Sequence, residues 1–470
     1  MLAEIKGLNE ECGVFAIWGH EKAAEMTYYG LHAMQHRGQE GAGIVTSDGD
    51  MLHLHKGNGL INEVFQKGEF NRLKGKAALG HVRYATQGGG GYENVQPLLF
   101  RSQKNSMALA HNGNLVNAYA LKNQLEAQGS ILQTTADTEV IAHLIKRSGH
   151  LNMEEAIKQA LGMIKGAYAF SILTEEKLYV ALDPRGLRPL SIGKLGNAYV
   201  IASETCAFDL IGATYEREVK PGELITIDDT GLSTMSFSSP MQRTLCSMEY
   251  VYFSRPDSNL NGLNVHASRK TMGKQLAHES PVEADVVTGV PDSSISAAIG
   301  FSEASGIPYE LGLIKNRYVG RTFIQPSQEL REQGVKMKLS PVRGIVNGKR
   351  VVMVDDSIVR GTTSRRIVRL LKEAGAKEVH VRIASPPIEN PCYYGIDTST
   401  KGELIAANYA VDEMRDIIGA DSLAFLTTEG LEKSIVTESN SLEHGVCKAC
   451  FTGNYPTEIY PETVIPAYKE

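Results

Sequence analysis

The stretch KRVVMVDDSIVRGTTSRRIVRLLKEAGA (residues 349–376) decides the fold of the second half of the chain. Its central segment, VVMVDDSIVRGTTS (Val351–Ser364), has the pattern of a buried strand, a loop and a helix that begins near Ser364. EADVVTGVPDSSISAAIGFSEASG (residues 283–306) repeats this order, and EVHVRIASPP (residues 378–387) adds a strand. Apolar strands that alternate with amphipathic helices predict an α/β domain with a parallel sheet. Its binding loops should lie at the carboxyl ends of the strands.

The loop of the central segment contains two kinds of functional group, carboxylates and phosphate-binding donors. Asp355 and Asp356 can accept hydrogen bonds from ribose hydroxyls, or they can hold a hard cation. The start of the following helix supplies backbone N–H groups and hydroxyls that suit a phosphate. These groups belong to Gly361, Thr362, Thr363 and Ser364. The stretch lacks the Lys of a Walker loop and the three glycines of a dinucleotide fingerprint. The alternative is a strand–turn–helix with solvated acids.

The segment resembles the phosphoribosyl-pyrophosphate-binding motif of the type I phosphoribosyltransferases. The resemblance implies that an earlier loop, VVTGVPDSSISAA (Val286–Ala298), binds the pyrophosphate, with Asp292 and Ser293 at the start of its helix. It also implies a magnesium site at Ser293, Asp355 and Asp356. So few protein ligands fit an Mg²⁺ ion that is bound mainly by substrate phosphates.

A basic segment lies between these two loops. Residues 311–344 carry seven Lys and Arg residues against two Glu residues. A charge run of this kind is often a solvated face. The family resemblance instead favours a mobile cationic lid that closes over the substrate phosphates and excludes water. Lys315 and Arg321 are the residues that we expect to bind phosphoribosyl pyrophosphate from this segment.

The first half of the chain has a different pattern of predicted secondary structure. Short β-type runs such as YAFSILT (residues 168–174) outnumber three stretches with helical apolar spacing, Ala23–Gln35, Thr138–Lys146 and Met153–Ile164. Many strands with few helices predict an α+β domain of antiparallel sheets covered by helices. The Ser- and Gly-rich stretch Gly231–Pro240 has no strand or helix pattern, so we expect the domain boundary there.

Cys12 follows a short acidic leader, MLAEIKGLNEE (residues 1–11). If the leader is removed, the new N-terminus carries both a thiol and an α-amino group, whose reference pKa is about 7.7–8.0. The amine can then act as general base for the thiol without help from a histidine. Taken alone, a cysteine at the start of a β-type run is more often part of the core. A Cys–His hydrolase that uses His81 or His111 is another alternative.

Four further segments bear on the role of Cys12. HRGQEGAGI (His36–Ile44), HVRYAT (His81–Thr86), HNGNLVN (His111–Asn117) and TTADTEV (Thr134–Val140) follow one another along the chain. Together they resemble the signature set of the class II glutamine amidotransferases. These enzymes belong to the N-terminal-nucleophile hydrolases, and the resemblance therefore implies a four-layer αββα fold for this half.

The same resemblance assigns roles around a bound glutamine. Arg83 would hold its α-carboxylate and Asp137 its α-amino group, as opposite charges should. Asn112 and the N–H of Gly113 would form the oxyanion hole for the tetrahedral intermediate. His111 would then position other groups and would not act as a base.

The remaining cysteines divide into a pair and three single residues. Cys447 and Cys450 form a C-x-x-C pair, which redox dithiols and zinc sites share. Together with Cys246 and Cys392 they could form one four-thiolate site, and spacing alone does not separate zinc from an iron–sulfur cluster. Cys206, in the strand-like context YVIASETCAF, is expected to be a small buried residue.

The sequence contexts of the four cysteines extend the resemblance. TLCSMEYVYFSRPDS (residues 244–258), PPIENPCYYGID (residues 386–397) and GVCKACFTGNYP (residues 445–456) look like one branch of the amidophosphoribosyltransferases. That branch carries a leader peptide and a [4Fe–4S] cluster, here implied on Cys246, Cys392, Cys447 and Cys450. No flavin or nicotinamide motif supplies an electron partner, so the cluster would be structural.

Length and composition agree with a two-domain enzyme. The chain has 470 residues with a net charge of −6, which favours two domains and argues against a nucleic-acid partner. No apolar run approaches the ~20 residues of a membrane span, and the leader lacks the apolar core of a secretory signal. We therefore expect a cytoplasmic protein. The predicted parts are the leader 1–11, a glutaminase domain 12–240, a phosphoribosyltransferase domain 241–440 and a tail 441–470.

The resemblance covers essentially the whole chain and implies a coupled reaction. Glutamine, water and phosphoribosyl pyrophosphate would give 5-phosphoribosylamine, pyrophosphate and glutamate, the entry step of de novo purine synthesis. Inhibition by purine nucleotides, a homotetramer and a closed passage for ammonia are implied by family only. The alternatives are another class II amidotransferase, a non-catalytic phosphoribosyl-pyrophosphate sensor and an iron–sulfur electron carrier.

Overall fold

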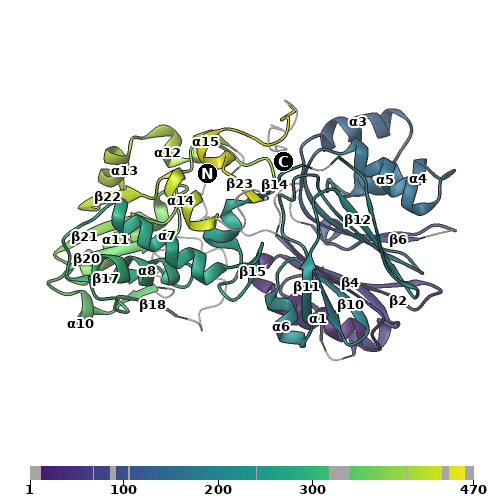
Figure 1. The fold of residues 1–470 in the computed structure, drawn as a ribbon, viewed down its shortest axis with the longest axis horizontal. Coiled ribbons are helices and arrows are strands. Elements are labelled where there is room, and N and C mark those ends of the chain that lie inside the picture. Colours follow the sequence, from purple (N-terminus) through teal and green to yellow (C-terminus); the bar gives the residue numbers. More distant parts are fainter. Residues whose placement is uncertain are drawn as a thin grey trace.

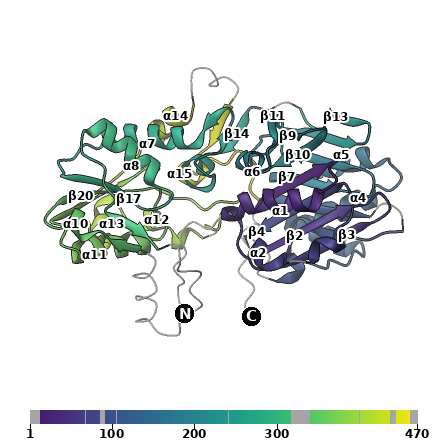
Figure 2. The same cartoon turned by 90° about the horizontal axis from the view of Figure 1, so that it is seen from below.

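The computed structural model describes residues 12–66, 68–84, 91–103, 106–239, 241–316, 339–398, 400–436 and 444–460. Two bodies lie side by side (Figure 1), and a view from below shows the same division (Figure 2). The N-terminal body, purple to teal, holds two stacked sheets between helices. The C-terminal body, teal to yellow, is built around a four-stranded sheet. The predicted leader and residues 317–338 of the basic segment lie outside the described residues.

Two antiparallel sheets form the middle of the N-terminal body. Their strands are β1 (Gly13–Trp18), β2 (Gly41–Ser47), β3 (Leu52–Asn58), β4 (Ala77–Arg83), β5 (Leu98–Phe100), β6 (Met107–Leu115), β7 (Gly166–Leu173), β8 (Leu178–Leu182), β9 (Ser191–Leu195), β10 (Ala198–Ala202), β11 (Thr214–Glu218), β12 (Glu223–Asp228) and β13 (Gly231–Ser236). In the described residues one sheet has the order β11-β9-β10-β1-β4-β2-β3, and the other has the order β13-β12-β8-β7-β6-β5.

Helices cover the outer face of each sheet. One sheet packs against α1 (Ala23–Ala33) and α6 (Cys206–Ile211). The other packs against α3 (Ala118–Ala127), α4 (Glu139–Arg147) and α5 (Met153–Met163). Figure 1 shows the resulting order of layers, with α3, α4 and α5 above the sheets and α1 and α6 below them. The predicted αββα arrangement is confirmed, and so are the three predicted helices; α3 was not predicted.

Alternation along β1 explains how the layers hold together. Side chains on a strand point alternately to its two faces. Val14 and Ala16 belong to the core between the two sheets. Phe15 and Ile17 belong to the core under α1. Every residue of β1 is buried, which is why the run reads as almost continuously apolar and not as an alternating strand.

The helix α5 shows how local sequence places one of these elements. Asn152 caps the helix, since its side chain accepts a hydrogen bond from the N–H of Glu155 at 2.9 Å. Glu154 and Glu155 in the first turn favour the positive end of the helix dipole. Ile157 and Leu161, one turn apart, are buried against the sheet. The apolar spacing therefore sets the face that α5 packs.

The stretch Gly231–Pro240 differs from the expectation of an unpatterned linker. Its first six residues form β13, which pairs antiparallel with β12 from Asp228↔Gly231 to Glu223↔Ser236. The strand lies at the edge of its sheet and most of its residues are partly or fully exposed. An edge strand that is exposed on both faces has no strong apolar alternation. The sequence pattern therefore missed it.

A parallel sheet forms the centre of the C-terminal body. Its strands are β17 (Val286–Gly289), β20 (Arg350–Asp355), β21 (Glu378–Ile383) and β22 (Ser422–Phe425). All three pairings along the order β17-β20-β21-β22 are parallel. One face packs against α7 (Val265–Glu279), α8 (Ile295–Ser305) and α14 (Thr428–Ile435), and the other against α11 (Thr362–Glu373) and α13 (Val411–Ile418). The predicted parallel α/β domain is confirmed.

The C-terminal tail returns to the boundary between the bodies. β23 (His444–Cys447) pairs in parallel with β14 (Arg243–Cys246), so that Cys246 lies opposite Cys447. The shorter elements named below are β18 (Leu313–Lys315), α15 (Ala449–Thr452) and the π-helical turn η4 (Glu249–Phe253). None of the helices in the described part of the chain is long and apolar enough to cross a membrane.

Candidate active sites

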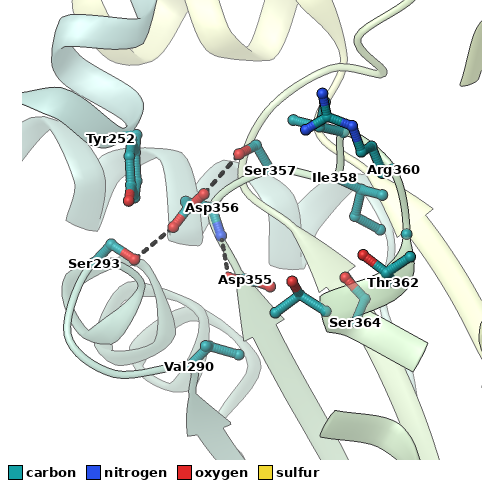
Figure 3. Close-up of a pocket in the computed structure, with 13 residues that line it drawn as sticks. Tyr252, Val290, Ser293, Asp355, Asp356, Ser357, Ile358, Arg360, Thr362 and Ser364 are labelled. Atoms are coloured by element: carbon teal, nitrogen blue, oxygen red, sulfur yellow. Dashed lines mark hydrogen bonds between the residues drawn. The ribbon is translucent and has the colours of Figure 1, made fainter. Parts of the chain in front are cut away.

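A pocket of about 160 Å³ lies at the carboxyl end of β20 (Figure 3). The strand ends at Asp355, and α11 begins at Thr362 after Gly361, whose φ of 73° is the left-handed conformation that favours glycine. The helix therefore starts two residues before the predicted Ser364. The pocket is lined by Tyr252, Val290, Ser293, Asp355, Asp356, Ser357, Ile358, Val359, Arg360, Gly361, Thr362, Thr363 and Ser364. The structure thus brings seven predicted residues, from two separate loops, into one cavity.

Hydroxyl groups hold the two carboxylates of this pocket. Ser293 Oγ donates to Asp356 Oδ2 at 2.5 Å, and Ser357 Oγ donates to Asp356 Oδ1 at 2.7 Å (Figure 3). Ser294 Oγ donates to Asp355 Oδ1 at 3.0 Å. Burial, with repulsion from Asp356, raises the pKa of Asp355 well above its ordinary value, and burial also raises the pKa of Asp356. Such a pair is stabilised by a cation or by donors from a ligand.

A resident metal centre made by protein side chains alone is not found in the described residues. No group of three or more His, Cys, Asp and Glu side chains there has an arrangement that could hold a metal ion. Two carboxylates and a serine hydroxyl nevertheless fit an Mg²⁺ ion that takes its other ligands from substrate phosphates and water. The donor set is hard oxygen, as Mg²⁺ requires.

The predicted cationic residues are only partly placed. Lys315 ends β18, and its Nζ lies 3.0 Å from Asp292 Oδ2 in the loop before α8. It therefore lies beside the predicted pyrophosphate loop, but it does not line the pocket. Arg321 lies outside the described residues, as does most of the predicted lid.

Two residues near this pocket were not predicted from the sequence. Tyr252 comes from η4, far along the chain from the two loops, and lines the pocket beside Asp356 (Figure 3). Arg269 is buried in α7, where its Nε donates to the carbonyl of Tyr250 at 2.7 Å. Its positive charge opposes the effect of burial on the pKa of Asp356. Tyr252 lies in the quoted segment 244–258, whose resemblance was applied only to Cys246, and Arg269 lies in none of the quoted segments, so neither was predicted as a site residue.

The second candidate site lies where β1 begins. Cys12 is half-buried, and its Sγ lies 3.5 Å from the carbonyl of Tyr84. Because Gly13 pairs with Val82, the next pair along the ladder places Cys12 beside Arg83 at the end of β4. Gly38 permits the close approach of the preceding loop, since a Cβ there would lie 2.6 Å from the backbone N of Arg83. The structure therefore brings the predicted residues Cys12 and Arg83 together, next to Gly38 of the first signature segment.

The third signature segment lies on β6. Gly113 has a φ of +132°, and a Cβ at this position would lie 2.2 Å from the carbonyl oxygen of Ala167. Only glycine fits there. Asn112 is 1% exposed, and its Nδ2 has no hydrogen-bond partner among the described residues. A buried amide that keeps a donor free is unusual and is expected where a ligand oxygen binds.

Asp137 and His111 form the next part of this site. Asp137 Oδ2 accepts a hydrogen bond from the N–H of Leu115 at 2.9 Å, and its Oδ1 lies 3.6 Å from His111 Nδ1. Burial opposes ionisation of Asp137, but His111 and the hydrogen bonds outweigh burial and lower its pKa. His111 stacks on Phe170 with ring centres 4.3 Å apart. The imidazole is therefore packed beside the carboxylate, in agreement with a positioning role.

His81 connects the two sheets and is poorly suited to act as a base. Its Nε2 lies 3.1 Å from the carbonyl of His111, across the interface between β4 and β6. Burial lowers the pKa of His81 to about 3. A general base is most effective when its pKa lies near the working pH. The Cys–His alternative is therefore not supported for His81.

We expect His81 to affect stability in acid. In the unfolded chain its pKa is near 6.5, but burial lowers it to about 3 in the folded protein. The unfolded state therefore binds a proton that the folded state does not. Stability from this group is complete above about pH 6.5 and falls by about 1.4 kcal/mol per pH unit as the pH drops toward 3. His81→Gln should make the decline of the thermal midpoint between pH 7 and 4 shallower; equal slopes would contradict the prediction.

A second cavity is lined by the four cysteines that were predicted as one ligand set. It is small, about 10 Å³, and lies where the tail meets both bodies. The lining residues are Leu187, Arg188, Cys246, Cys392, Tyr394, Ile396, Cys447, Ala449 and Cys450. Burial, together with the neighbouring thiols, raises the pKa of Cys450 well above its ordinary value. Burial raises that of Cys447 to about 12. Metal binding would require these thiols to lose their protons, and in the described residues they are not among any group of three or more side chains arranged to hold a metal ion.

Cys206 lies away from that cavity. It is 2% exposed and begins α6, so the expected burial is confirmed. The strand-like context was misleading, because the strand β10 ends at Ala202 and the chain turns before the helix.

Comparison with known proteins identifies the family. A family model described as a glutamine amidotransferase domain matches residues 81–209, and one described as a phosphoribosyl transferase domain matches residues 269–391. The amidophosphoribosyltransferase of Bacillus subtilis strain 168 is 71% identical over 471 residues, which cover 100% of this chain and 99% of that protein. The chain belongs to the amidophosphoribosyltransferase family.

More distant relatives and solved structures agree. The amidophosphoribosyltransferase of Staphylococcus aureus strain MRSA252 is 54% identical, with 97% of this chain and 92% of that protein covered. The glutamine phosphoribosylpyrophosphate amidotransferase from B. subtilis, complexed with ADP and GMP, matches with a TM-score of 0.93 at 69% identity. That match covers 97% of this chain and 100% of the other. The chain is therefore a transferase with a glutamine amidotransferase domain.

Proposed function

We propose that the chain transfers ammonia from glutamine to phosphoribosyl pyrophosphate, giving 5-phosphoribosylamine, pyrophosphate and glutamate. This reaction is the first step of de novo purine synthesis. The observation that carries the proposal is the presence of two different sites in one chain of this family. One has the Cys12 thiol where β1 begins and, on β6, the buried Asn112 amide with a free donor, and the other has two carboxylates facing a helix N-terminus.

The glutamine half-reaction begins at Cys12. After removal of residues 1–11, the α-amino group of Cys12 takes the thiol proton and Sγ attacks the amide carbon of glutamine. Asn112 Nδ2 and the N–H of Gly113 stabilise the oxyanion, while Arg83 and Asp137 bind the α-carboxylate and α-amino group. The C–N bond breaks, and the proton from the α-amino group leaves with ammonia. Water then hydrolyses the thioester to glutamate.

The second half-reaction takes place in the pocket after β20. Asp355 and Asp356 accept hydrogen bonds from the ribose hydroxyls, and the first turn of α11 binds the 5-phosphate through its N–H groups. Lys315 and Arg321 contribute positive charge toward the phosphates. Ammonia attacks the anomeric carbon as pyrophosphate leaves. Ser293, Asp355 and Asp356 would hold an Mg²⁺ ion together with the substrate phosphates, and the ion would neutralise the negative charge that develops on the departing pyrophosphate.

A [4Fe–4S] cluster on Cys246, Cys392, Cys447 and Cys450 is the cofactor proposed for the second cavity. Two observations support this proposal: the four thiols line one apolar cavity, and their sequence contexts resemble the cluster-bearing branch of the family. The cluster would tie the tail to both bodies and would supply structure without catalysis. We expect close to four iron and four sulfide per chain in anaerobically purified protein, and loss of both in Cys450→Ser. Stoichiometric zinc in place of iron would contradict the assignment.

Regulation, assembly and location are proposals of the same kind. The B. subtilis structure that matches this chain holds ADP and GMP, which supports inhibition by purine nucleotides here. A homotetramer and a cytoplasmic location follow from the family resemblance. Neither is needed for the chemistry proposed above.

Product release tests the coupled reaction directly. Purified protein is given glutamine and Mg²⁺, with and without phosphoribosyl pyrophosphate, and glutamate and pyrophosphate are measured. We expect the two products in equal amounts when both substrates are present. Glutamate without pyrophosphate would mean that the acceptor is a different molecule, and pyrophosphate without glutamate would remove the glutaminase assignment.

A further inference from the structure

A fully buried group of charges lies behind the candidate nucleophile. Arg37 donates from Nη1 to Glu204 Oε1 at 2.6 Å and from Nη2 to Glu249 Oε1 at 2.7 Å. All three side chains have no solvent exposure. The remaining nitrogen of the guanidinium, Nε, donates to the backbone carbonyl of Cys12 at 3.2 Å. One arginine therefore holds the nucleophile's backbone while two carboxylates hold the arginine.

The two carboxylates belong to different halves of the chain. Glu204 lies between β10 and α6 of the N-terminal body, and Glu249 begins η4 on the C-terminal side of the boundary. Ser254 Oγ donates to Glu249 Oε2 at 2.7 Å. Arg269, from α7, donates to the carbonyl of Ser254 at 2.8 Å. The position of Glu249 is therefore set by the phosphoribosyl half.

The geometry of Arg37 depends on both carboxylates. Arginine presents its donors in a rigid planar fork, so two fixed acceptors determine where the third donor points. Glu204 has other partners, including Ser258 Oγ at 2.7 Å and His36 Nε2 at 2.7 Å. Glu249 contacts both terminal nitrogens of Arg37, at 3.0 Å for Nη1. Loss of the Glu249 charge would free the guanidinium to rotate toward Glu204 and away from the Cys12 carbonyl.

We propose that Glu249 is a positioning residue for glutamine hydrolysis that the phosphoribosyl half contributes to the glutaminase site. Through Arg37 it fixes the backbone of Cys12, and with it the directions of the thiol and of the α-amino group that takes its proton. The inference rests on the assignment of Cys12 as the nucleophile. It means that the glutaminase centre is incomplete without residues beyond the N-terminal body.

Glu249→Gln in the full-length enzyme tests this inference. We expect kcat with glutamine to fall about 10- to 100-fold, because a displacement of the nucleophile on the order of 1 Å has an effect of this size. The KM for glutamine should change little, since Arg83 and Asp137 are untouched. Activity with ammonium salts should stay within about twofold of the wild type, and Glu249→Asp should restore part of the glutamine-dependent kcat.

Glu218→Gln is the matched control. Glu218 Oε2 pairs with Arg243 Nη2 at 2.5 Å, and the side chains are 11% and 6% exposed. This pair also connects β11 with the segment that follows the N-terminal body, and its contacts within the described part of the chain are separate from Arg37 and Cys12. We expect the control to keep the wild-type ratio of glutamine- to ammonia-supported activity.

Two results would overturn the inference. One is an unchanged glutamine-dependent kcat in Glu249→Gln. The other is an equal loss of glutamine- and ammonia-supported activity, which would indicate a structural role only. Arg37→Lys is a second variant, since lysine keeps the charge but lacks the fork, and it should show the same glutamine-selective loss. Failure of the Cys12 assignment would appear separately, as glutamine use by a Cys12→Ala variant.

Discussion

Cys12→Ala is expected to abolish phosphoribosylamine formation from glutamine while activity with ammonium salts is retained. Loss of a covalent nucleophile removes the thioester pathway, and we expect the rate with glutamine to fall by at least about 10⁴-fold. Ammonia from solution reaches the second pocket without the first half-reaction. Cys12 lies at the start of β1, and the Asp355–Asp356 pocket lies in the other body. The measurement is pyrophosphate release with each nitrogen source in turn.

Cys206→Ser is the control for this prediction. Cys206 is the other cysteine of the N-terminal body, and it is 2% exposed. Serine keeps a donor for its contact with Glu204 Oε2, which lies 3.7 Å from the sulfur. We expect both activities to persist in this variant. Glutamine-dependent turnover in Cys12→Ala at more than a trace would show that another group is the nucleophile.

The glutaminase half shows what local sequence can predict. Its signature segments led to the prediction of Arg83, Asn112 and Asp137 and supported that of Cys12, because each segment is a strand end or turn whose residues have fixed backbone roles. Gly113 is an example, since its positive φ and the nearby Ala167 carbonyl exclude any side chain. A motif of this kind determines the local backbone conformation and therefore the direction of its side chains. The αββα layers then follow from the apolar faces of the strands.

Contacts between distant segments could not be predicted in the same way. Tyr252 lines the phosphoribosyl pocket from η4, and Glu249 at the start of the same turn contacts Arg37, 212 positions away. Both lie in the segment 244–258, whose resemblance pointed only to Cys246, and no periodicity marks either residue because their contacts are with distant parts of the chain. The edge strand β13 was missed for a related reason, since its exposed residues leave little apolar pattern. Sequence motifs predicted individual residues of each site, whereas the structure was needed to show which residues from distant segments contact them.

Asp356→Asn is expected to remove activity with both nitrogen sources. Asp356 accepts from Ser293 and Ser357 and faces the pocket (Figure 3), so the substitution removes one of two charges available to ribose hydroxyls or Mg²⁺ while keeping the shape. We expect kcat/KM for phosphoribosyl pyrophosphate to fall at least about 100-fold, or about 2.7 kcal/mol.

Asp285→Asn is the control for Asp356→Asn, because Asp285 pairs with Arg350 at the opposite end of the same parallel strands. It removes a carboxylate from the same domain without touching the pocket, so its kcat/KM should stay near that of the wild type. Pyrophosphate release is measured with glutamine and then with ammonia. A defect in binding phosphoribosyl pyrophosphate must lower activity with either nitrogen source, because both reactions use this acceptor. If Asp356→Asn lost the activity with glutamine but kept the activity with ammonia, the acidic pair would act in the release of ammonia from glutamine and not in binding the acceptor.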